Sequence, residues 1–287
     1  PQCRDLDGHH PGGCSFCSPL GTKVNTSTTT DEYNHTANAL ELSFPYAKKD
    51  ADLVSYYRLE SNTSAGVTSD ETGTNIGTIN GVTATSSGKF DGAYNFSGTT
   101  QSINVSDSNT LDLTNLTISA WVKTDSLGAL RAIVCKGETT SSVNIPYFMA
   151  ISAGNVLYGS IGNSTNYKDL TGVTALTTNT WYHVAMTVNN TYMTIYLNGV
   201  SDKTTTKTVV PFNSDNQLVI GGIYKTGVSY FWNGTIDEVK IYNDTLTATE
   251  VKTLYNAGKQ YIDTTATTPV ANWTSTAQTI TAGYYLK

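Results

Sequence analysis

Charged residues and long apolar runs are scarce in this chain of 287 residues. Asp, Glu, Lys and Arg make up 14% of it and the formal net charge is −6, so it lacks the basic surface that nucleic acids and anionic membranes require. No stretch approaches the roughly 18 consecutive apolar residues of a membrane-spanning helix. The sequence therefore predicts neither a nucleic-acid partner nor a membrane span.

Lysine and glutamate are also sparse, whereas threonine, serine, asparagine, glycine and tyrosine are abundant. The chain has 24 Gly and 18 Tyr but only 7 Pro and 4 Cys. This composition favours strands and turns over helices, so we expect an all-β protein. A chain of this length can hold one large β domain with extensions, or two small domains.

Four segments can be distinguished along the chain. Residues 1–21 are rich in Cys, His, Gly and Pro, and residues 22–50 form a Thr-rich arm with one possible strand. Short strand signals separated by Gly, Asn and Ser recur through residues 51–257 at the spacing of a β-sandwich. Residues 258–287 are a second Thr-rich, β-prone extension. The expected plan is one domain with an arm at each end.

The stretch 235–242, TIDEVKIY, alternates with the period of two that is expected of a strand. This alternation places Ile236 and Glu238 on one face of the strand and Asp237 and Val239 on the other.

One short helix is predicted directly after this strand. Thr247 and Glu250 have the spacing of a capping box, in which each side chain satisfies a backbone N–H at the start of the helix. Leu246 and Val251 stand where a hydrophobic staple would place them, and Gly258 is the expected stop.

Segments in the middle of the chain resemble, in the same order, those of the laminin-G-like branch of the concanavalin A-like lectin/glucanase jelly rolls. The resemblance implies a two-sheet antiparallel jelly-roll sandwich over residues 51–257, with one curved sheet facing a shallow groove. The segments that carry it are LVSYYRLE (53–60), TNIGTINGVTAT (74–85), GKFDGAYNFSG (88–98), LTISAWVKT (116–124), WYHVAMTVNNTYMTIYLNGV (181–200), LVIGG (218–222) and WNGTIDEVKIYNDTLT (232–247).

A glycoside hydrolase is the first functional hypothesis that this resemblance raises. The glucanase relatives carry a Glu-x-Asp-x-(x)-Glu pattern whose alternate residues share one strand face, and retaining enzymes hold two carboxyls about 5–5.5 Å apart. Asp237 and Glu238 are adjacent, and Val239 and Ile241 occupy the positions where further carboxylates would be needed. We therefore expect no catalytic residues and no enzyme, with a glucanase-like hydrolase as the alternative.

A calcium ion is the second hypothesis. Asp91, in the loop FDGAY, and Asp237 stand where the resemblance suggests acidic loop ligands, and many relatives hold a structural calcium at the edge of the sandwich. Calcium prefers several oxygen ligands of this kind. Gln101 stands where relatives often have a further Asp. The alternative is that both aspartates cap turns.

The amino-terminal segment holds a cluster of metal-binding and disulfide-forming residues. Its cysteines and histidines have spacings that suit a zinc ion, whereas a secreted chain would oxidise the cysteines. Two N-terminal cysteines could pair and leave the third for Cys135, and sequence does not choose among the connectivities. The cluster consists of Cys3, His9, His10, Cys14 and Cys17.

Two tyrosines are candidate glycan-binding residues. Tyr224 and Tyr230 lie in the Gly-rich stretch GGIYKTGVSYFWNG, and exposed rings stack on sugar rings while neighbouring polar groups bond the hydroxyls. Ordinary surface tyrosine is the alternative.

Eleven N-x-[ST] sequons indicate a secreted, N-glycosylated protein. Asn95 and Asn115 flank strand-like runs and are expected to be buried. The remaining nine are predicted glycosylation sites: Asn25, Asn34, Asn62, Asn104, Asn163, Asn189, Asn233, Asn243 and Asn272.

The function most consistent with these features is a non-catalytic cell-surface protein that binds glycans in adhesion. A self-assembling subunit of an extracellular filament or surface layer competes with it, because each arm holds a short apolar alternation that could add a strand to a neighbouring copy. A viral or appendage receptor-binding protein is a further alternative. The alternations are Leu40-x-Leu42-x-Phe44 and Trp273 through Ile280 to Leu286.

Overall fold

The computed structural model describes residues 50–60, 66–137, 142–225 and 228–257. Apart from Asp50, the two predicted arms lie outside these ranges, as does the amino-terminal Cys/His cluster.

The described chain is built almost entirely of strands, as the composition predicts. The strands are accompanied by one α-helix, α1 (Ala248–Ala257). There are also three short 3-10 helices in the described chain: η2 (Asp50–Asp52), η3 (Asn109–Leu111) and η4 (Ser142–Asn144). The strands are β1 (Leu53–Tyr57), β2 (Val67–Thr68), β3 (Gly77–Asn80), β4 (Thr83–Thr85), β5 (Ala93–Ser97), β6 (Ser102–Val105), β7 (Leu116–Thr124), β8 (Arg131–Lys136), β9 (Tyr147–Ile151), β10 (Val156–Gly162), β11 (Tyr167–Ala175), β12 (Trp181–Val188), β13 (Tyr192–Leu197), β14 (Val200–Thr206), β15 (Leu218–Ile220), β16 (Tyr224–Lys225), β17 (Val228–Ser229) and β18 (Asn233–Tyr242).

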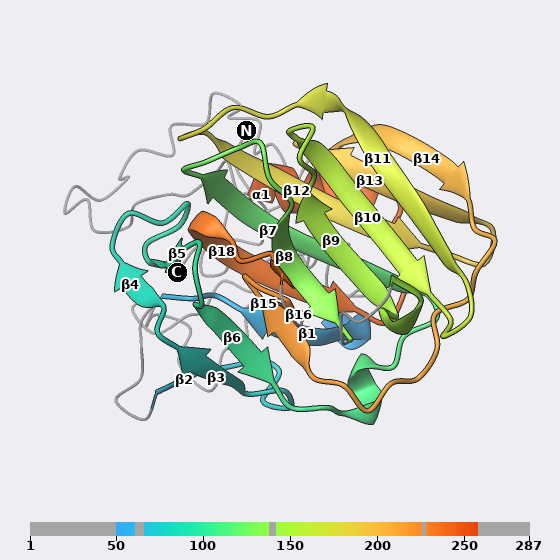
Figure 1. Ribbon diagram of the computed structural model, residues 1–287, viewed down its shortest axis with the longest axis horizontal. Coiled ribbons are helices and arrows are strands. Elements are labelled where there is room, and N and C mark those ends of the chain that lie inside the picture. Colours follow the sequence, from blue (N-terminus) through green and yellow to red (C-terminus); the bar gives the residue numbers. More distant parts are fainter. Residues whose placement is uncertain (1–49, 61–65, 138–141, 226–227, 258–287) are drawn as a thin grey trace, which may run out of the picture. The chain divides into compact units, whose positions relative to one another are not determined.

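Two antiparallel sheets of eight strands form a sandwich, and Figure 1 shows one lying behind the other. The first sheet has the order β14-β13-β12-β7-β18-β5-β4, and β1 also pairs with β18. The second has the order β11-β10-β9-β8-β15-β6-β3-β2, and β16 and β17 form a separate hairpin. The predicted two-sheet antiparallel sandwich is confirmed.

The core lies between the sheets and is filled by alternate residues of both. Ile118 and Ala120 of β7 face Met149 and Ile151 of β9 in one continuous apolar cluster, and all four are at most 1% exposed. Strand β7 is buried along nearly its whole length, so both of its faces are covered.

The hairpins of the first sheet follow the turn signals of the sequence. Strands β13 and β14 are joined by Asn198 and Gly199, whose φ angles of 51° and 75° are those of a two-residue type I′ turn. Strands β12 and β13 meet at the polar turn Asn189–Thr191.

Helix α1 begins with the predicted capping box. The backbone N–H of Thr247 donates to Oε2 of Glu250 at 2.7 Å, and the N–H of Glu250 donates to Oγ1 of Thr247 at 3.3 Å. The helix covers the outer face of the first sheet, where Tyr255 stacks on Trp121 with ring centroids 5.7 Å apart. This contact fixes the end of the domain against strand β7.

The aromatic layer under α1 also encloses His183 of β12. Its ring lies 5.4 Å from that of Trp121 and 6.1 Å from that of Tyr255, and its buried Nδ1 has no hydrogen-bond partner among the described residues. Burial, with a contribution from Lys240, lowers the pKa of His183 to about 3. The imidazole is therefore neutral in the folded state.

We expect His183 to make the fold sensitive to mild acid. The folded pKa lies below the ordinary value of 6.5, so this group contributes stability above pH 6.5 that is lost as the pH falls toward 3. The side chain introduced by His183→Phe cannot titrate. When the pH is lowered from 7 to 4, the unfolding free energy of this variant should therefore fall less than that of the wild type, and the difference should reach up to about 3 kcal/mol. Urea unfolding of both proteins at both pH values measures this, and equal losses would contradict it.

Candidate functional site

Strand β18 changes its partner in the middle of the first sheet. It pairs with β7 along one edge, whereas its other edge pairs with β5 through residues 233–236 and with β1 through residues 239–242. Asp237 and Glu238, at the change, pair with neither β5 nor β1. A seam therefore opens between β5 and β1, beside these two acidic residues.

A β-bulge occupies the same two positions. The register with β7 shifts between Asp237 and Lys240, and Glu238 adopts a φ of 53°, a left-handed conformation that is uncommon for a residue with a side chain. The core side chains of β18 are consequently Ile236, Val239 and Ile241, with a step of three residues across the bulge and the ordinary step of two after it. The predicted face assignment of this strand is wrong from the bulge onward.

The bulge turns both carboxylates away from the core. Glu238 accepts a hydrogen bond from the hydroxyl of Tyr56 at 2.6 Å and forms an ion pair with Lys240 at 3.3 Å. Asp237 pairs with Trp121, whose ring lies on the outer face under α1. The expectation that Asp237 and Glu238 point to opposite faces is therefore corrected, because one extra residue breaks the period of two.

Asp237 fastens the loop that precedes β5. Its Oδ2 accepts the backbone N–H groups of Lys89 and Phe90 at 2.8 and 3.0 Å, while its Oδ1 is buried without a hydrogen-bond partner among the described residues. Burial is the main cause that raises the pKa of Asp237 to about 8, and Glu238 adds to the rise while the two N–H groups oppose it. A positive charge near Oδ1 would relieve this cost.

The loop of residues 86–92 is fastened at two more points. The ammonium group of Lys89 lies 4.3 Å from the ring centroid of Trp121, and the N–H of Gly92 donates to Oε2 of Glu60 at 2.7 Å. A Cβ atom on residue 92 would lie 2.2 Å from the carbonyl oxygen of Glu60. Only glycine permits this approach, so the residues that follow β1 and precede β5 are held side by side.

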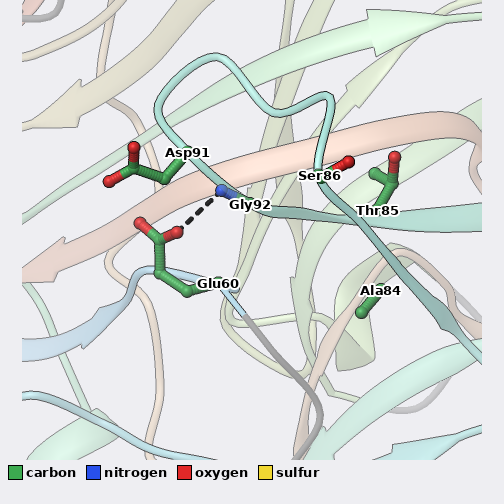
Figure 2. Close-up of a pocket in the computed structure, with 6 residues that line it drawn as sticks. All are labelled: Glu60, Ala84, Thr85, Ser86, Asp91 and Gly92. Atoms are coloured by element: carbon green, nitrogen blue, oxygen red, sulfur yellow. Dashed lines mark hydrogen bonds between the residues drawn. The ribbon is translucent and has the colours of Figure 1, made fainter. Parts of the chain in front are cut away.

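A hollow of about 450 Å³ lies at this seam. Figure 2 shows the carboxylates of Glu60 and Asp91 on the same side of the loop, with the hydroxyls of Thr85 and Ser86 across from them. Burial is the main cause that raises the pKa of Glu60, and Asp91 and Glu238 add to the rise. The lining residues are Glu60, Ala84, Thr85, Ser86, Asp91 and Gly92.

These residues fit a hard cation such as calcium. The hollow offers carboxylate and hydroxyl oxygens, which is the donor set that calcium prefers, and one oxygen of Glu60 already pairs with Arg58 at 3.0 Å. Asp237, which accepts N–H groups of the same loop, adds a buried oxygen without a donor. Within the described ranges no three Asp, Glu, His or Cys side chains are close enough to form a site by themselves, so backbone carbonyls and water would complete the coordination. A bound ion would neutralise the carboxylates and tie the loop to β18.

Glu60 is the site residue that sequence reasoning missed. It ends the segment LVSYYRLE just beyond β1, and nothing in its local pattern distinguishes it from an exposed strand-end glutamate. Its position became evident only when the chain placed it against Gly92, 32 residues further along.

The two candidate tyrosines do not join this hollow. Tyr230 is half-buried against a second apolar cluster that includes Phe148 and Ile223 and lies on the outer face of the second sheet. Tyr224 lies in the short strand β16, which pairs with β17. Their role in glycan binding stays a prediction.

Cys135 is a free, fully buried thiol in that same cluster. Burial raises its pKa well above the ordinary value, so the thiol is protonated and unreactive. A disulfide through Cys135 would require the cluster to open. The possible partners Cys3, Cys14 and Cys17 lie outside the described residues, so the choice between disulfides and zinc in their segment stays a prediction.

The fold separates the predicted sequons by environment. Asn163 and Asn189 lie at hairpin tips, Asn104 and Asn233 lie within strands, and Asn243 is exposed after β18. The other four predicted sites, Asn25, Asn34, Asn62 and Asn272, lie outside the described residues.

Solved structures share this two-sheet architecture. The binding domain of Paraclostridial Mosquitocidal Protein 1 superposes with a TM-score of 0.58 and 18% identity over 72% of this chain and 52% of that one. Domain 4 of AbnA, a GH43 extracellular arabinanase from Geobacillus stearothermophilus, was solved in complex with arabinotriose. It superposes with a TM-score of 0.57 and 22% identity over 71% of this chain and 98% of that one. The botulinum neurotoxin serotype G binding domain superposes with a TM-score of 0.56 and 17% identity over 71% of this chain and 50% of that one.

These likenesses define the fold class as a two-sheet antiparallel β-sandwich. The chain spans about half the length of the toxin binding domains, and at these identities the likeness concerns the fold alone. The family model of the concanavalin A-like lectin/glucanases superfamily matches residues 97–252. The chain belongs to this superfamily.

Two negative findings accompany the match. Among curated protein sequences no significant match is found. In the described part of the chain no helix is long and apolar enough to cross a membrane.

We expect stability to depend on the Asp237 oxygen that accepts the two loop N–H groups and not on the oxygen that has no partner. Asp237→Asn keeps an oxygen for the N–H groups of Lys89 and Phe90 and removes a buried charge, so in the presence of a chelator it should unfold at a urea concentration no lower than the wild type. Asp237→Ala leaves both N–H groups without an acceptor and should cost about 2–3 kcal/mol. Equal losses in the two variants would contradict this account of the loop.

Proposed function

We propose that this chain is a non-catalytic, extracellular glycan-binding module that uses the hollow between β1 and β5. The observation that carries the proposal is the juxtaposition of Glu60, Asp91, Thr85 and Ser86 around one open hollow of about 450 Å³. Carboxylates and hydroxyls at fixed positions are the groups that hydrogen-bond sugar hydroxyls, and charged acceptors make the stronger bonds.

Calcium is part of the proposal. The unpartnered Oδ1 of Asp237 and the carboxylates of Glu60 and Asp91 would hold the ion beside the hollow. The ion would hold the loop of residues 86–92 in place, and ligand affinity would then depend on it. The superfamily membership of the chain and the arabinotriose bound by the AbnA domain support a sugar as the ligand class.

The engagement of the two β18 carboxylates supports a non-catalytic role. Asp237 is committed to backbone N–H groups, and Glu238 is committed to Tyr56 and Lys240. A general acid or nucleophile needs a carboxylate that can reach the substrate, whereas Asp237 is fully buried and Glu238 is 9% exposed. A reducing-sugar assay on β-glucans and arabinans tests the alternative of a glycoside hydrolase, and turnover that Asp237→Asn abolishes would establish that alternative.

A glycan array probed with the full chain tests binding. We expect binding in calcium that a chelator reduces, and Asp91→Asn should weaken it by about tenfold or more, because a charge-assisted hydrogen bond is worth about 1.5–3 kcal/mol. Asp215→Asn, which changes an exposed aspartate in the loop before β15, is the matched control. Tyr224→Ala and Tyr230→Ala test the two predicted tyrosines separately from the hollow.

The array has three informative outcomes. Binding that Asp91→Asn leaves intact and Tyr230→Ala removes would move the site to the second sheet. A preference for host-cell surface glycans would favour the receptor-binding alternative. The absence of any glycan ligand in calcium would refute the proposed function.

Self-assembly is the second candidate function, and the sheet edges favour it. The edge strands β11 and β14 lie beside one another, and the carboxylate of Asp202 in β14 accepts the N–H groups of Val173 and Thr174. This part of β11 is therefore already hydrogen-bonded. Val200 on the β14 edge is 64% exposed. Sheet edges with exposed apolar residues are templates for strand addition, and we propose β14 as the edge to which a terminal arm of a second copy adds a strand.

Light scattering and electron microscopy test assembly. The full chain should form filaments or sheets at high concentration, and Val200→Lys should prevent them while leaving the monomer folded. Deletion of residues 1–50 should also prevent them if the amino-terminal arm is the donor. A full chain that remains strictly monomeric would exclude this function.

A further inference from the structure

Two hairpin tips on opposite sheets of the sandwich have the same geometry. At the β10–β11 tip, Oδ1 of Asn163 accepts the N–H groups of Thr165 and Asn166 at 3.2 and 2.8 Å. At the β12–β13 tip, Oδ1 of Asn189 accepts the N–H groups of the residues two and three positions later, at 2.7 and 2.6 Å. In both tips the amide oxygen is committed to the turn.

The amide nitrogens at these tips are not committed. Nδ2 of neither Asn163 nor Asn189 donates a hydrogen bond to another residue of the described chain. Thr165 and Thr191, the third residues of the two sequons, are exposed. The turn therefore holds each side chain by its oxygen and leaves its nitrogen available for modification.

Only the β12–β13 tip has an aromatic ring opposite the asparagine. The N–H of Asn189 donates to the carbonyl of Tyr192 at 3.0 Å, so the two residues are directly opposed and their side chains share one face. Tyr192 is 49% exposed. At the other tip the residue opposite Asn163 is Asn166, which offers no ring.

Other sequons of the described chain lack this arrangement. Nδ2 of Asn233 donates to Ser126 Oγ at 2.8 Å, and Oδ1 of Asn115 is buried. Asn243 is exposed, but the hydroxyl of its sequon threonine, Thr245, donates to a backbone carbonyl at 2.6 Å. A glycan on Nδ2 of Asn233 would break its contact with Ser126, and the buried amide oxygen of Asn115 leaves little room for a bulky group on the same amide, so we expect neither to be modified in the folded protein.

We infer that Asn189 is an N-glycosylation site whose first sugar packs on the ring of Tyr192, and that Asn163 is a second site without such a contact. In the reaction Nδ2 forms a bond to C1 of an isoprenoid-pyrophosphate-linked oligosaccharide and gives up a proton to the transferase, and the C1–oxygen bond breaks to release the isoprenoid pyrophosphate. The attached sugar would cover an exposed ring whose face suits stacking. The inference shares with the proposed function only the passage of the chain through a secretory pathway.

Glycopeptide mass spectrometry on the full chain, secreted from a eukaryotic line that installs N-glycans, tests the sites. We expect glycans at Asn189 and Asn163 and none at Asn115 or Asn233, with Thr191→Ala abolishing the glycan at Asn189 alone. An unmodified Asn189, or folded protein modified at Asn233, would overturn the inference. The glycan array is independent of this result, because unglycosylated chain can be used for it.

A set of melting temperatures tests the ring contact. In glycosylated protein, Thr191→Ala, which removes the sequon and keeps the Asn189 turn, should lower the melting temperature by about 2 °C, and it should have no such effect in a Tyr192→Ala background. Thr165→Ala, which removes the sequon of Asn163 in the same way, is the matched control and should cause no loss. The same variants made in bacteria without glycans should all melt within error of their parents. A loss from Thr191→Ala that persists without Tyr192, or without glycans, would refute the contact.

Discussion

The β-bulge of strand β18 is the constraint on which the candidate site depends. β18 joins β7 on one edge and both β5 and β1 on the other, and the bulge falls where the second edge changes partner. Without the extra residue, Glu238 would face the core, where an unpaired carboxylate is costly. With it, Val239 fills the core and both carboxylates lie at the seam.

The same seam accounts for the acidic character of the hollow. Asp237 accepts the backbone N–H groups of Lys89 and Phe90, and Glu60 accepts that of Gly92, so both hold the loop of residues 86–92 in place. Burial of these groups raises the pKa of each. A ligand or cation that neutralised them would therefore stabilise the loop that forms one wall of the proposed binding site.

Some aromatic residues of the chain are buried and support the fold, whereas others are exposed and can contact a ligand. Trp121, His183 and Tyr255 form a closed layer under α1, and Tyr230 is half-buried on the second sheet. Tyr192 is exposed because it lies at a hairpin tip beyond the reach of core packing. Sequence position alone did not distinguish these environments, since the aromatic residue of a strand, a loop or a helix can face either the core or the solvent.

The sequence by itself determined the capping box of α1 and the Asn198–Gly199 turn, because each depends on residues close together in the chain. Composition determined the all-β class, and the order of the resembling segments along the chain determined the superfamily. The sequence also identified Asp91 and Asp237 as acidic candidates. Only the tertiary structure decided where the carboxylates of β18 point, because an alternating pattern cannot show a bulge that the partner strands impose. It likewise decided that Glu60 belongs to the site, since a contact between residues 60 and 92 arises only when two strands far apart in sequence are placed beside one another.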